Sequence, residues 1–291
     1  MKPLQGKVVV VAGATRGAGR GIAVKLGQAG AVVYCTGRSV RGNPSDLNRR
    51  ETIDETAEMV TAAGGTGIPV RVDHTVPAEV KALFERIRQE QNGRLDILVN
   101  DIWGGEKLIS WNTPFWEYPL DNALLMQQRA VWTHLITSHY AAPLMAARKQ
   151  GLIVEITDGT DYRFRGDVYY SLAKIAPIHL AEGMAEQLRP HGVAVVAVSP
   201  GFLRSEEMLD FFGVTEANWR DAVTSGKYGA EHFGESETPY FVGQGVAALA
   251  ADPDIMNKSG RAFGSWDLSD AYGGFVDEDG RRPHWGNYAR K

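Results

Sequence analysis

The sequence predicts a doubly wound α/β fold, in which helices cover both faces of one parallel sheet. Seven short apolar segments alternate with helix-compatible segments along the chain, which is the order that crossover helices impose on parallel strands. The strand segments are continuous apolar runs rich in Val and Ile, as expected of strands buried on both faces. With 44% hydrophobic and 23% charged residues, the composition is that of an ordinary globular protein.

The chain begins with a strand, a turn, a helix and a second strand. Residues 7–12 read Lys-Val-Val-Val-Val-Ala, residues 18–29 suit a helix, and residues 31–36 form a second apolar, β-branched run. Neighbouring parallel strands need such a crossover, and about thirty residues is its usual length. We therefore predict a βαβ unit at the N-terminus.

The same alternation continues through most of the chain. Further strands are predicted at 67–72, 95–100, 151–157, 193–198 and 261–266. Helices are predicted at 48–63, 76–87, 121–147, 170–188 and 240–251, several with apolar residues at helical spacing. No linker or internal repeat interrupts the pattern, which predicts a single domain over residues 1–291.

Two segments lie outside this alternation. Residues 202–239 have aromatic and helical character but no strand of their own. We expect them to form a lid over the carboxyl ends of the strands, where such folds bind ligands. Residues 267–291 form a polar tail, which we expect either to wrap another subunit or to fray.

Charge and composition argue against several classes of protein. The net charge is −4 and no Lys/Arg block occurs, so no nucleic-acid partner is expected. No apolar run approaches the roughly 18 residues that span a bilayer, and no secretory signal is recognisable. Cys35 is the only cysteine and the seven histidines lack metal-site spacing. These observations predict a cytoplasmic protein with no membrane contact and no metal.

The first predicted strand ends in a glycine-rich turn, Gly13-Ala-Thr15-Arg16-Gly17-Ala-Gly19. A turn of this kind between a strand and a helix lets the backbone approach a pyrophosphate and directs the helix N-terminus at it. Glycines also serve any tight βα turn, and the spacing is G-x-x-x-G-x-G. The strand before it and the helix after it favour dinucleotide binding.

The end of the second predicted strand indicates which dinucleotide binds. An acidic residue there would bond the adenosine ribose of NAD and repel a 2′-phosphate. In this chain Gly37 is followed by Arg38, Arg16 lies in the glycine turn near the same corner, and Arg41 is close by in sequence. Because the planar guanidinium suits phosphate, we predict NADPH/NADP+ as cofactor, unless these arginines are simply solvated.

Tyr170 and Lys174 lie four residues apart in a predicted helix. This spacing places the phenol and the ammonium one turn apart on the same face. A nearby ammonium lowers a phenol pKa, so we expect a Tyr170 that donates or accepts a proton near neutral pH. The alternative is a surface tyrosine with an incidental lysine.

Together these motifs resemble the short-chain dehydrogenase/reductase family. The glycine turn, Asp73 after the third strand, Asn100 closing the fourth, Tyr170-x-x-x-Lys174, and Pro200-Gly201 after the sixth occur in the family's order. The resemblance covers about residues 5–266 and implies a Rossmann-like fold that binds NADP(H). Residues 17–23, 93–100 and 151–154 are most similar to the branch of dehydrogenase/reductase member 1.

The resemblance also implies roles for individual residues. It implies that Asp73 contacts the adenine amine, that Asn100 lines the cofactor channel, and that Lys174 binds the nicotinamide ribose. Pro200, Gly201 and Ser205 would then lie near the nicotinamide carboxamide. Asp73 could instead be a turn acid and Ser205 a helix N-cap, while His74 would be either adenine-adjacent or structural.

The chain departs from the family at three places. Asn100-Asp101-Ile102-Trp103-Gly104 stands where Asn-Asn-Ala-Gly is usual, and Gln128 falls in a gapped alignment where the family has a catalytic asparagine. Asp158 occupies the position of the serine that bonds the substrate oxygen, with Thr157 and Thr160 as neighbouring hydroxyls. Pteridine reductases carry aspartate at that position, and residues 153–158 resemble theirs.

Three functions are compatible with these residues. The first is NADPH-dependent reduction of a carbonyl on a bulky or aromatic small molecule, with Tyr170 as proton donor, Lys174 as its partner and Asp158 positioning the substrate. The second is C=N reduction of an imine or pterin-like ring with Asp158 as acid. The third is a catalytically weak NADP(H)-binding regulator, since the serine is missing. The family implies a homodimer or homotetramer, and several aromatic residues could clamp a flat substrate: Trp103, Trp111, Trp116, Tyr162, Phe164, Phe211, Phe212 and Trp219.

Overall fold

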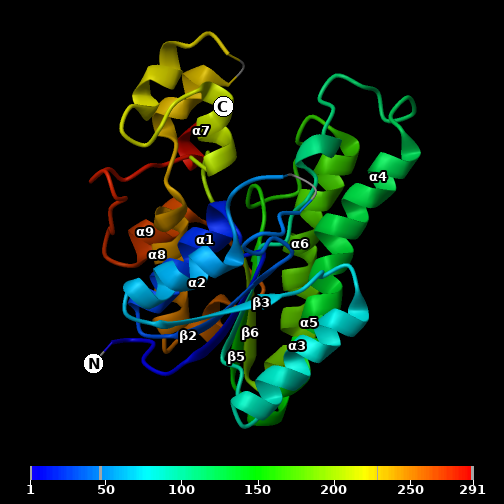
Figure 1. Ribbon diagram of the computed structural model, residues 1–291, viewed down its shortest axis with the longest axis vertical. Coiled ribbons are helices and arrows are strands. Elements are labelled where there is room, and N and C mark those ends of the chain that lie inside the picture. The colour runs from blue at the N-terminus through cyan, green and yellow to red at the C-terminus, as the bar shows by residue number, and fades with distance from the viewer. Residues whose placement is uncertain (1, 46–47, 228, 290–291) are drawn as a thin grey trace.

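The computed structural model describes residues 2–45, 48–227 and 229–289 and contains, within them, one seven-stranded parallel sheet with helices on both faces (Figure 1). The strands are β1 Val8–Ala12, β2 Val32–Gly37, β3 Thr66–Arg71, β4 Ile97–Asn100, β5 Gly151–Ile156, β6 Val193–Ser199 and β7 Ala262–Gly264. Their order is β3-β2-β1-β4-β5-β6-β7. The order reverses between β1 and β4, where folds of this type bind ligands. The predicted fold class is confirmed.

The sheet is held by apolar side chains that alternate between its two faces. In β1, Val9 and Val11 pack on one face, and Val8 and Val10 pack on the other, as the period of two requires. All five residues of β1 are buried, because a central parallel strand is covered on both sides. The continuous valine run seen in the sequence is thus the centre of the core.

Helices form a layer on each side of the sheet. They are α1 Gly17–Gln28, α2 Ile53–Ala62, α3 Pro77–Glu90, α4 Leu120–Gln127, α5 Thr133–Arg148, α6 Val168–Leu188, α7 Glu206–Phe212, α8 Pro239–Ala251, α9 Ser265–Ala271 and α10 Gly286–Ala289. Residues of α1, α2, α8 and α9 pack on one face, and residues of α3, α5 and α6 pack on the other (Figure 1). No helix in the described ranges is long and apolar enough to cross a membrane.

Several predicted boundaries were wrong. The long helix expected over 121–147 is interrupted by a π-helical turn, Gln128–Trp132, between α4 and α5. Such a wide turn shifts the register of side chains along the helix. The helix expected to begin at residue 48 begins at Ile53, because the Thr52 hydroxyl accepts a hydrogen bond from the Glu55 N–H and caps it there.

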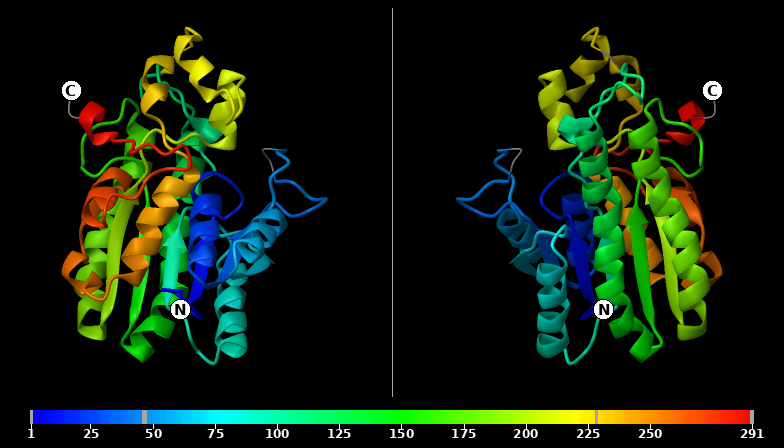
Figure 2. Two further views of the ribbon diagram at one scale, coloured as in Figure 1. Left: turned by 90° about the vertical axis from the view of Figure 1, so that its left-hand side faces the viewer. Right: turned by 90° about the vertical axis from the view of Figure 1, so that its right-hand side faces the viewer.

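The segment 202–239 lies above the carboxyl edge of the sheet (Figure 2). It contains α7 and two 3-10 helices, Trp219–Thr224 and Ala230–Glu235. Its own small apolar cluster includes Phe212, Trp219 and Phe233. A segment with an apolar cluster of its own can keep its shape, and its two ends connect it to the elements of the sheet.

The tail from residue 267 packs against its own chain as far as Gly286, whereas 290–291 lie outside the described residues. Its first residues form α9, and the Asp277 carboxylate accepts a hydrogen bond from the Thr238 N–H at the base of α8. The Trp285 ring meets the Phe202 ring at 5.7 Å between centroids. These contacts argue against fraying of the tail up to Trp285, and the expectation that it contacts another subunit stays a prediction.

Candidate active site

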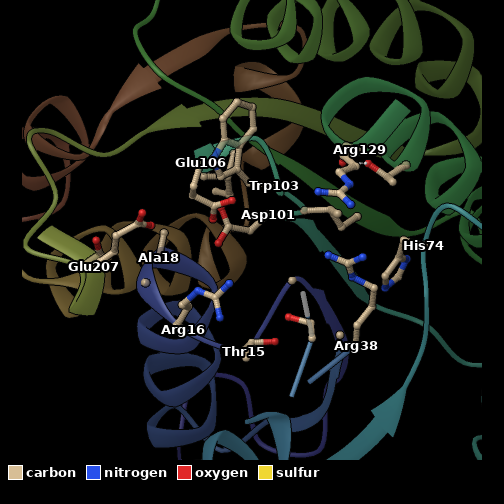
Figure 3. Close-up of a pocket in the computed structure, with 18 of the residues that line it drawn as sticks. Thr15, Arg16, Ala18, Arg38, His74, Asp101, Trp103, Glu106, Arg129 and Glu207 are labelled. Atoms are coloured by element: carbon tan, nitrogen blue, oxygen red, sulfur yellow. Dashed lines mark hydrogen bonds between the residues drawn. The ribbon is translucent and has the colours of Figure 1, made fainter. Parts of the chain in front are cut away.

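A cavity of about 390 Å³ opens at the carboxyl edge of the sheet, and residues that follow β1 and β4 help to line it (Figure 3). It brings together residues between Gly13 and Met208. Of the predicted site residues, eleven line it: Gly13, Thr15, Arg16, Gly17, Arg38, Asp73, His74, Tyr170, Lys174, Pro200 and Ser205. The residues outside this lining are Gly19, Asn100, Gln128, Asp158 and Gly201.

The glycine turn requires its glycines for close backbone packing. Gly13 has φ +92°, and a Cβ there would lie 2.3 Å from the Asp101 carbonyl oxygen. A Cβ on Gly19 would lie 2.3 Å from the Gly13 carbonyl oxygen. Gly19 therefore lets the start of the helix pack closely against the turn. The Gly17 N–H donates to Glu206 Oε2 at 2.8 Å, so a carboxylate from α7 already partners the first N–H of α1.

Two arginines approach the cavity from opposite sides of Thr15 (Figure 3). Nη1 of Arg16 is buried and has no hydrogen-bond partner within the described ranges. Arg38 lies close enough to Asp73 to help lower the pKa of that carboxyl. Arg41, by contrast, faces solvent and pairs with Glu58 at 2.8 Å.

Asp73 and His74 lie at the Arg38 end of the cavity. Partial burial acts to raise the pKa of Asp73, but hydrogen bonds from the Thr75 N–H and hydroxyl outweigh it and hold that pKa below its usual value. Burial lowers the pKa of His74 to about 3, so its ring is neutral. Its nitrogens contact the Thr36 and Thr137 hydroxyls at 2.8 and 2.9 Å. Both residues therefore serve local structure while lining the cavity.

Asn100 lies behind the cavity wall in a buried polar network. Its amide donates to Glu155 Oε1 at 2.8 Å and to the Ser138 hydroxyl at 2.9 Å. Glu155 Oε2 is 2.5 Å from His134 Nδ1, and His134 Nε2 is 3.0 Å from the Ile102 carbonyl oxygen. Asn100 thus ties β4 to β5 and α5, and it supports the loop after β4 from behind.

Tyr170 and Lys174 line the cavity, and Asp158 contacts Tyr170 from outside the lining. Asp167 caps α6 by accepting from the Tyr170 N–H at 2.6 Å, which orients the first turn. The Tyr170 hydroxyl donates to Asp158 Oδ2 at 2.8 Å. Burial and the Asp158 carboxylate raise the pKa of Tyr170 well above 10. The expectation that Lys174 lowers the phenol pKa was wrong, because Asp158 is the charge in direct contact.

The remaining predicted residues are divided between the cavity and its surroundings. Ser205 lines the cavity and also caps α7 by accepting from the Met208 N–H at 3.3 Å. The Gly201 N–H donates to the buried Glu237 carboxylate. Gln128 begins the π-helical turn, and the neighbouring Arg129 lines the cavity instead.

Sequence reasoning missed three acidic residues in the cavity wall, Asp101, Glu106 and Glu207 (Figure 3). Burial raises the pKa of Asp101 to about 7, and burial also raises the pKa of Glu207. The departure of residues 101–104 from the family pattern could have found Asp101, whereas no pattern in the sequence singles out Glu106 or Glu207. In the described parts of the chain, no group of three His, Cys, Asp or Glu side chains is arranged to hold a metal ion.

Comparison with known proteins places this geometry in a family. Residues 7–212 match the family model described as short chain dehydrogenase. The chain is 37% identical to mouse Dehydrogenase/reductase SDR family member 1 over 281 residues, covering 96% of this chain and 85% of the relative. It is 28% identical to the 3-oxoacyl-[acyl-carrier-protein] reductase of Aquifex aeolicus, over 78% of this chain and 86% of the relative.

Solved structures share the fold. A short-chain dehydrogenase from Mycobacterium thermoresistibile superposes with a TM-score of 0.76 at 24% identity, covering 93% of this chain and 88% of that one. The order of motifs, the site geometry, the family model and the relatives agree: the chain belongs to the short-chain dehydrogenase/reductase family and is similar to its member 1 branch.

Proposed function

We propose that this protein is an NADPH-dependent reductase that reduces a ketone or aldehyde on a bulky or aromatic small molecule. The observation that carries the proposal is that Tyr170 and Lys174 line the same cavity as Arg16 and Arg38. The two arginines can hold a nucleotide phosphate, and Tyr170 can donate a proton in the same cavity. The aromatic residues Trp103 and Trp111 stand edge-on to the Tyr170 ring, with centroids 5.8 and 5.0 Å away, and favour a flat or bulky substrate.

The cavity fits a nicotinamide dinucleotide phosphate. Arg16 offers a buried Nη1 without a hydrogen-bond partner among the described residues, which a phosphate oxygen would satisfy. A Cβ on Gly37 would lie 2.6 Å from Thr15 Oγ1. The lack of a side chain at Gly37 therefore leaves space for the adenosine end of the cofactor. When bound, the cofactor would supply the hydride, and Arg16, Arg38 and Asp73 would hold its adenosine end.

The protonation state of Tyr170 favours reduction. Because its pKa is raised well above 10 by burial and by Asp158, the phenol keeps its proton throughout the neutral range. A protonated phenol can donate to the oxygen that forms when a carbonyl carbon accepts hydride. The reverse oxidation would need a phenolate, which the nearby carboxylate disfavours.

A second candidate, reduction of a C=N bond, is favoured by one contact. Asp158 lies 2.8 Å from the Tyr170 hydroxyl, so a second acidic group stands beside the proton donor. A carboxylic acid in an apolar, aromatic site can act as a proton donor to a ring nitrogen. The two candidates therefore differ in which of these groups gives up the proton.

The test is a screen of NADPH oxidation with ketones, aldehydes, quinones and cyclic imines. We expect turnover with carbonyl compounds, and Tyr170→Phe should lower it by roughly 10²- to 10⁴-fold while cofactor binding is kept. Turnover with imines alone would favour the second candidate. Tight NADPH binding without turnover of any class would instead indicate a regulatory nucleotide-binding protein.

We further propose a cytoplasmic homodimer or homotetramer. Adjoining segments of α4, the π-helical turn, α5 and α6 expose large apolar side chains: Leu120, Leu124, Trp132, Leu135 and Leu172. Apolar surface of this kind is typical of protein contacts. Sedimentation should give a multiple of 31.8 kDa, and Leu124→Glu should reduce the mass toward one chain. A monomeric parent protein would contradict this proposal.

A further inference from the structure

The Lys174 ammonium rests on the face of the Trp103 indole. Its Nζ atom lies 3.9 Å from the ring centroid, compared with 5.7 Å from the Tyr170 centroid. Within the described ranges, no hydrogen bond or ion pair to this ammonium is present. Among the described residues, the indole face is therefore the closest favourable contact of this ammonium.

The indole is itself held firmly. A Cβ on Gly105 would lie 2.6 Å from two carbon atoms of the ring, so the Gly105 backbone packs directly against the indole. The ring also joins the apolar cluster that includes Leu108 and Met126. It meets the Tyr170 ring edge-on, at 5.8 Å and 88°. A rigid ring can therefore fix the ammonium at a constant place relative to the phenol.

The charges around Lys174 show why this contact matters. Burial lowers the pKa of Lys174, and the like charge of Arg165 acts in the same direction. The carboxylates of Asp158, Asp101 and Glu106 oppose this effect from a distance. The face of an indole carries negative electrostatic potential and attracts a desolvated cation without competing for its hydrogen bonds. The N–H groups that do not face the ring thus remain available to the cavity.

We propose that Trp103 is a positioning residue whose indole face holds the Lys174 ammonium, charged and in place, beside Tyr170. This inference rests on the proposed function, because it assigns Lys174 to the same reaction. It also gives a reason for the tryptophan at position 103. Among the described residues, no acidic side chain contacts the ammonium directly, and the loop after β4 supplies an aromatic face in its place.

The first test compares variants at two tryptophans. Trp103→Leu should lower turnover and move the basic limb of its pH profile down by about one unit, the size expected for a buried cation–π contact. Trp103→Phe, which keeps an aromatic face, should recover most of the shift. Trp111→Leu is the matched control: it removes the other indole beside Tyr170, so it should alter turnover without moving the limb. If the basic limb of the pH profile lies at the same pH in Trp103→Leu and Trp111→Leu, the proposal is overturned.

The second test measures Lys174 in the cofactor-free protein and does not depend on any substrate. The protein is labelled with ¹³C-lysine, and the Lys174 Cε signal is assigned by its loss in Lys174→Met. Its titration should move to lower pH in Trp103→Leu. Site-specific fluorinated tryptophan at 103, which weakens the ring's negative face with little change of shape, should give graded shifts even if the leucine variant does not fold. An unchanged titration across the fluorinated series would refute the cation–π contact, whatever the enzyme reduces.

Discussion

Arg38 and Arg41 are close in sequence but differ in what they contact, and this difference makes a prediction about cofactor choice. Arg38 lines the cavity, whereas Arg41 is paired with Glu58 in solvent. Losing a charge-assisted hydrogen bond costs about 1.5 to 3 kcal/mol, so Arg38→Asp should weaken NADPH roughly 10- to 150-fold relative to NADH. Calorimetry at fixed salt measures both affinities. Arg41→Asp is the control and should leave the preference intact; a parent protein that binds both cofactors equally would refute the assignment.

Asp158 separates the two candidate reactions at the level of one side chain. Asp158→Asn keeps the shape and a hydrogen bond to Tyr170 but removes the charge that helps raise the phenol pKa. If Asp158 only positions the substrate, Asp158→Asn and Asp158→Ser should reduce ketones within about tenfold of the parent rate. If Asp158 is the acid for a C=N bond, the Asn variant should lose imine reduction, because an amide delivers no proton. Steady-state rates with a ketone and a cyclic imine distinguish these outcomes.

At the scale of elements, the lid is anchored by a buried arginine that lies between two cavity residues. Arg204 follows Leu203 and precedes Ser205, both of which line the cavity. Its guanidinium donates to the Ser236 carbonyl oxygen at 2.9 Å and to Asp279 at 3.2 Å, and it stacks 4.1 Å from the Trp219 ring. The side chain is fully buried. Arg204 therefore ties the start of the lid to its end and to the tail.

Removing this anchor should destabilise the protein and loosen the cavity. Arg204→Met leaves the buried Asp277 carboxylate, 3.7 Å from Arg204 Nη2, without its counterion. Such a change typically costs about 3 to 5 kcal/mol, and it should raise the KM for cofactor more than it lowers kcat. Arg220→Met is the matched control, since Arg220 stacks on the same Trp219 ring from solvent and should cost under about 1 kcal/mol. Urea unfolding measures both, and equal losses would contradict the anchor.

At the scale of the whole molecule, Glu237 joins the lid, the loop after β6 and α9. It is completely buried, it accepts hydrogen bonds from the Ser265 hydroxyl at 2.5 Å and from the Gly201 N–H, and burial raises its pKa to about 8. The folded state thus holds a proton that the unfolded chain releases near pH 4.5. Stability from this proton is complete below about pH 4.5 and is lost as the pH rises toward 8.

This linkage predicts a pH-dependent stability that one substitution removes. The free energy of unfolding in the parent should fall between about pH 4.5 and 8, by at most about 1.4 kcal/mol per pH unit from this group. Glu237→Gln keeps the neutral shape and should flatten that part of the curve. Glu117→Gln, at an exposed position, should not change it. If Glu237→Gln keeps the parent slope, the buried carboxyl is not the source.

The sequence by itself determined the fold class, the order of the strands along the chain and eleven of the residues that line the cavity. These follow from local patterns: continuous valine runs identify buried parallel strands, and Gly13, Tyr170 and Lys174 lie in motifs only a few residues long. Parallel strands bring their carboxyl ends to one edge whatever the details of packing. For this reason eleven of the predicted site residues line one cavity.

Only the tertiary structure decided how the side chains in that cavity act on one another. Tyr170 meets Asp158 and not a nearby ammonium, Asn100 turns behind the wall toward Glu155, and Lys174 rests on Trp103. Each contact joins residues that do not share a local motif. The strength of each contact depends on how deeply its polar groups are buried, which the local sequence around them does not report. The pKa of a buried phenol depends on which charge lies within hydrogen-bond distance, and that distance exists only once the sheet has brought its loops together.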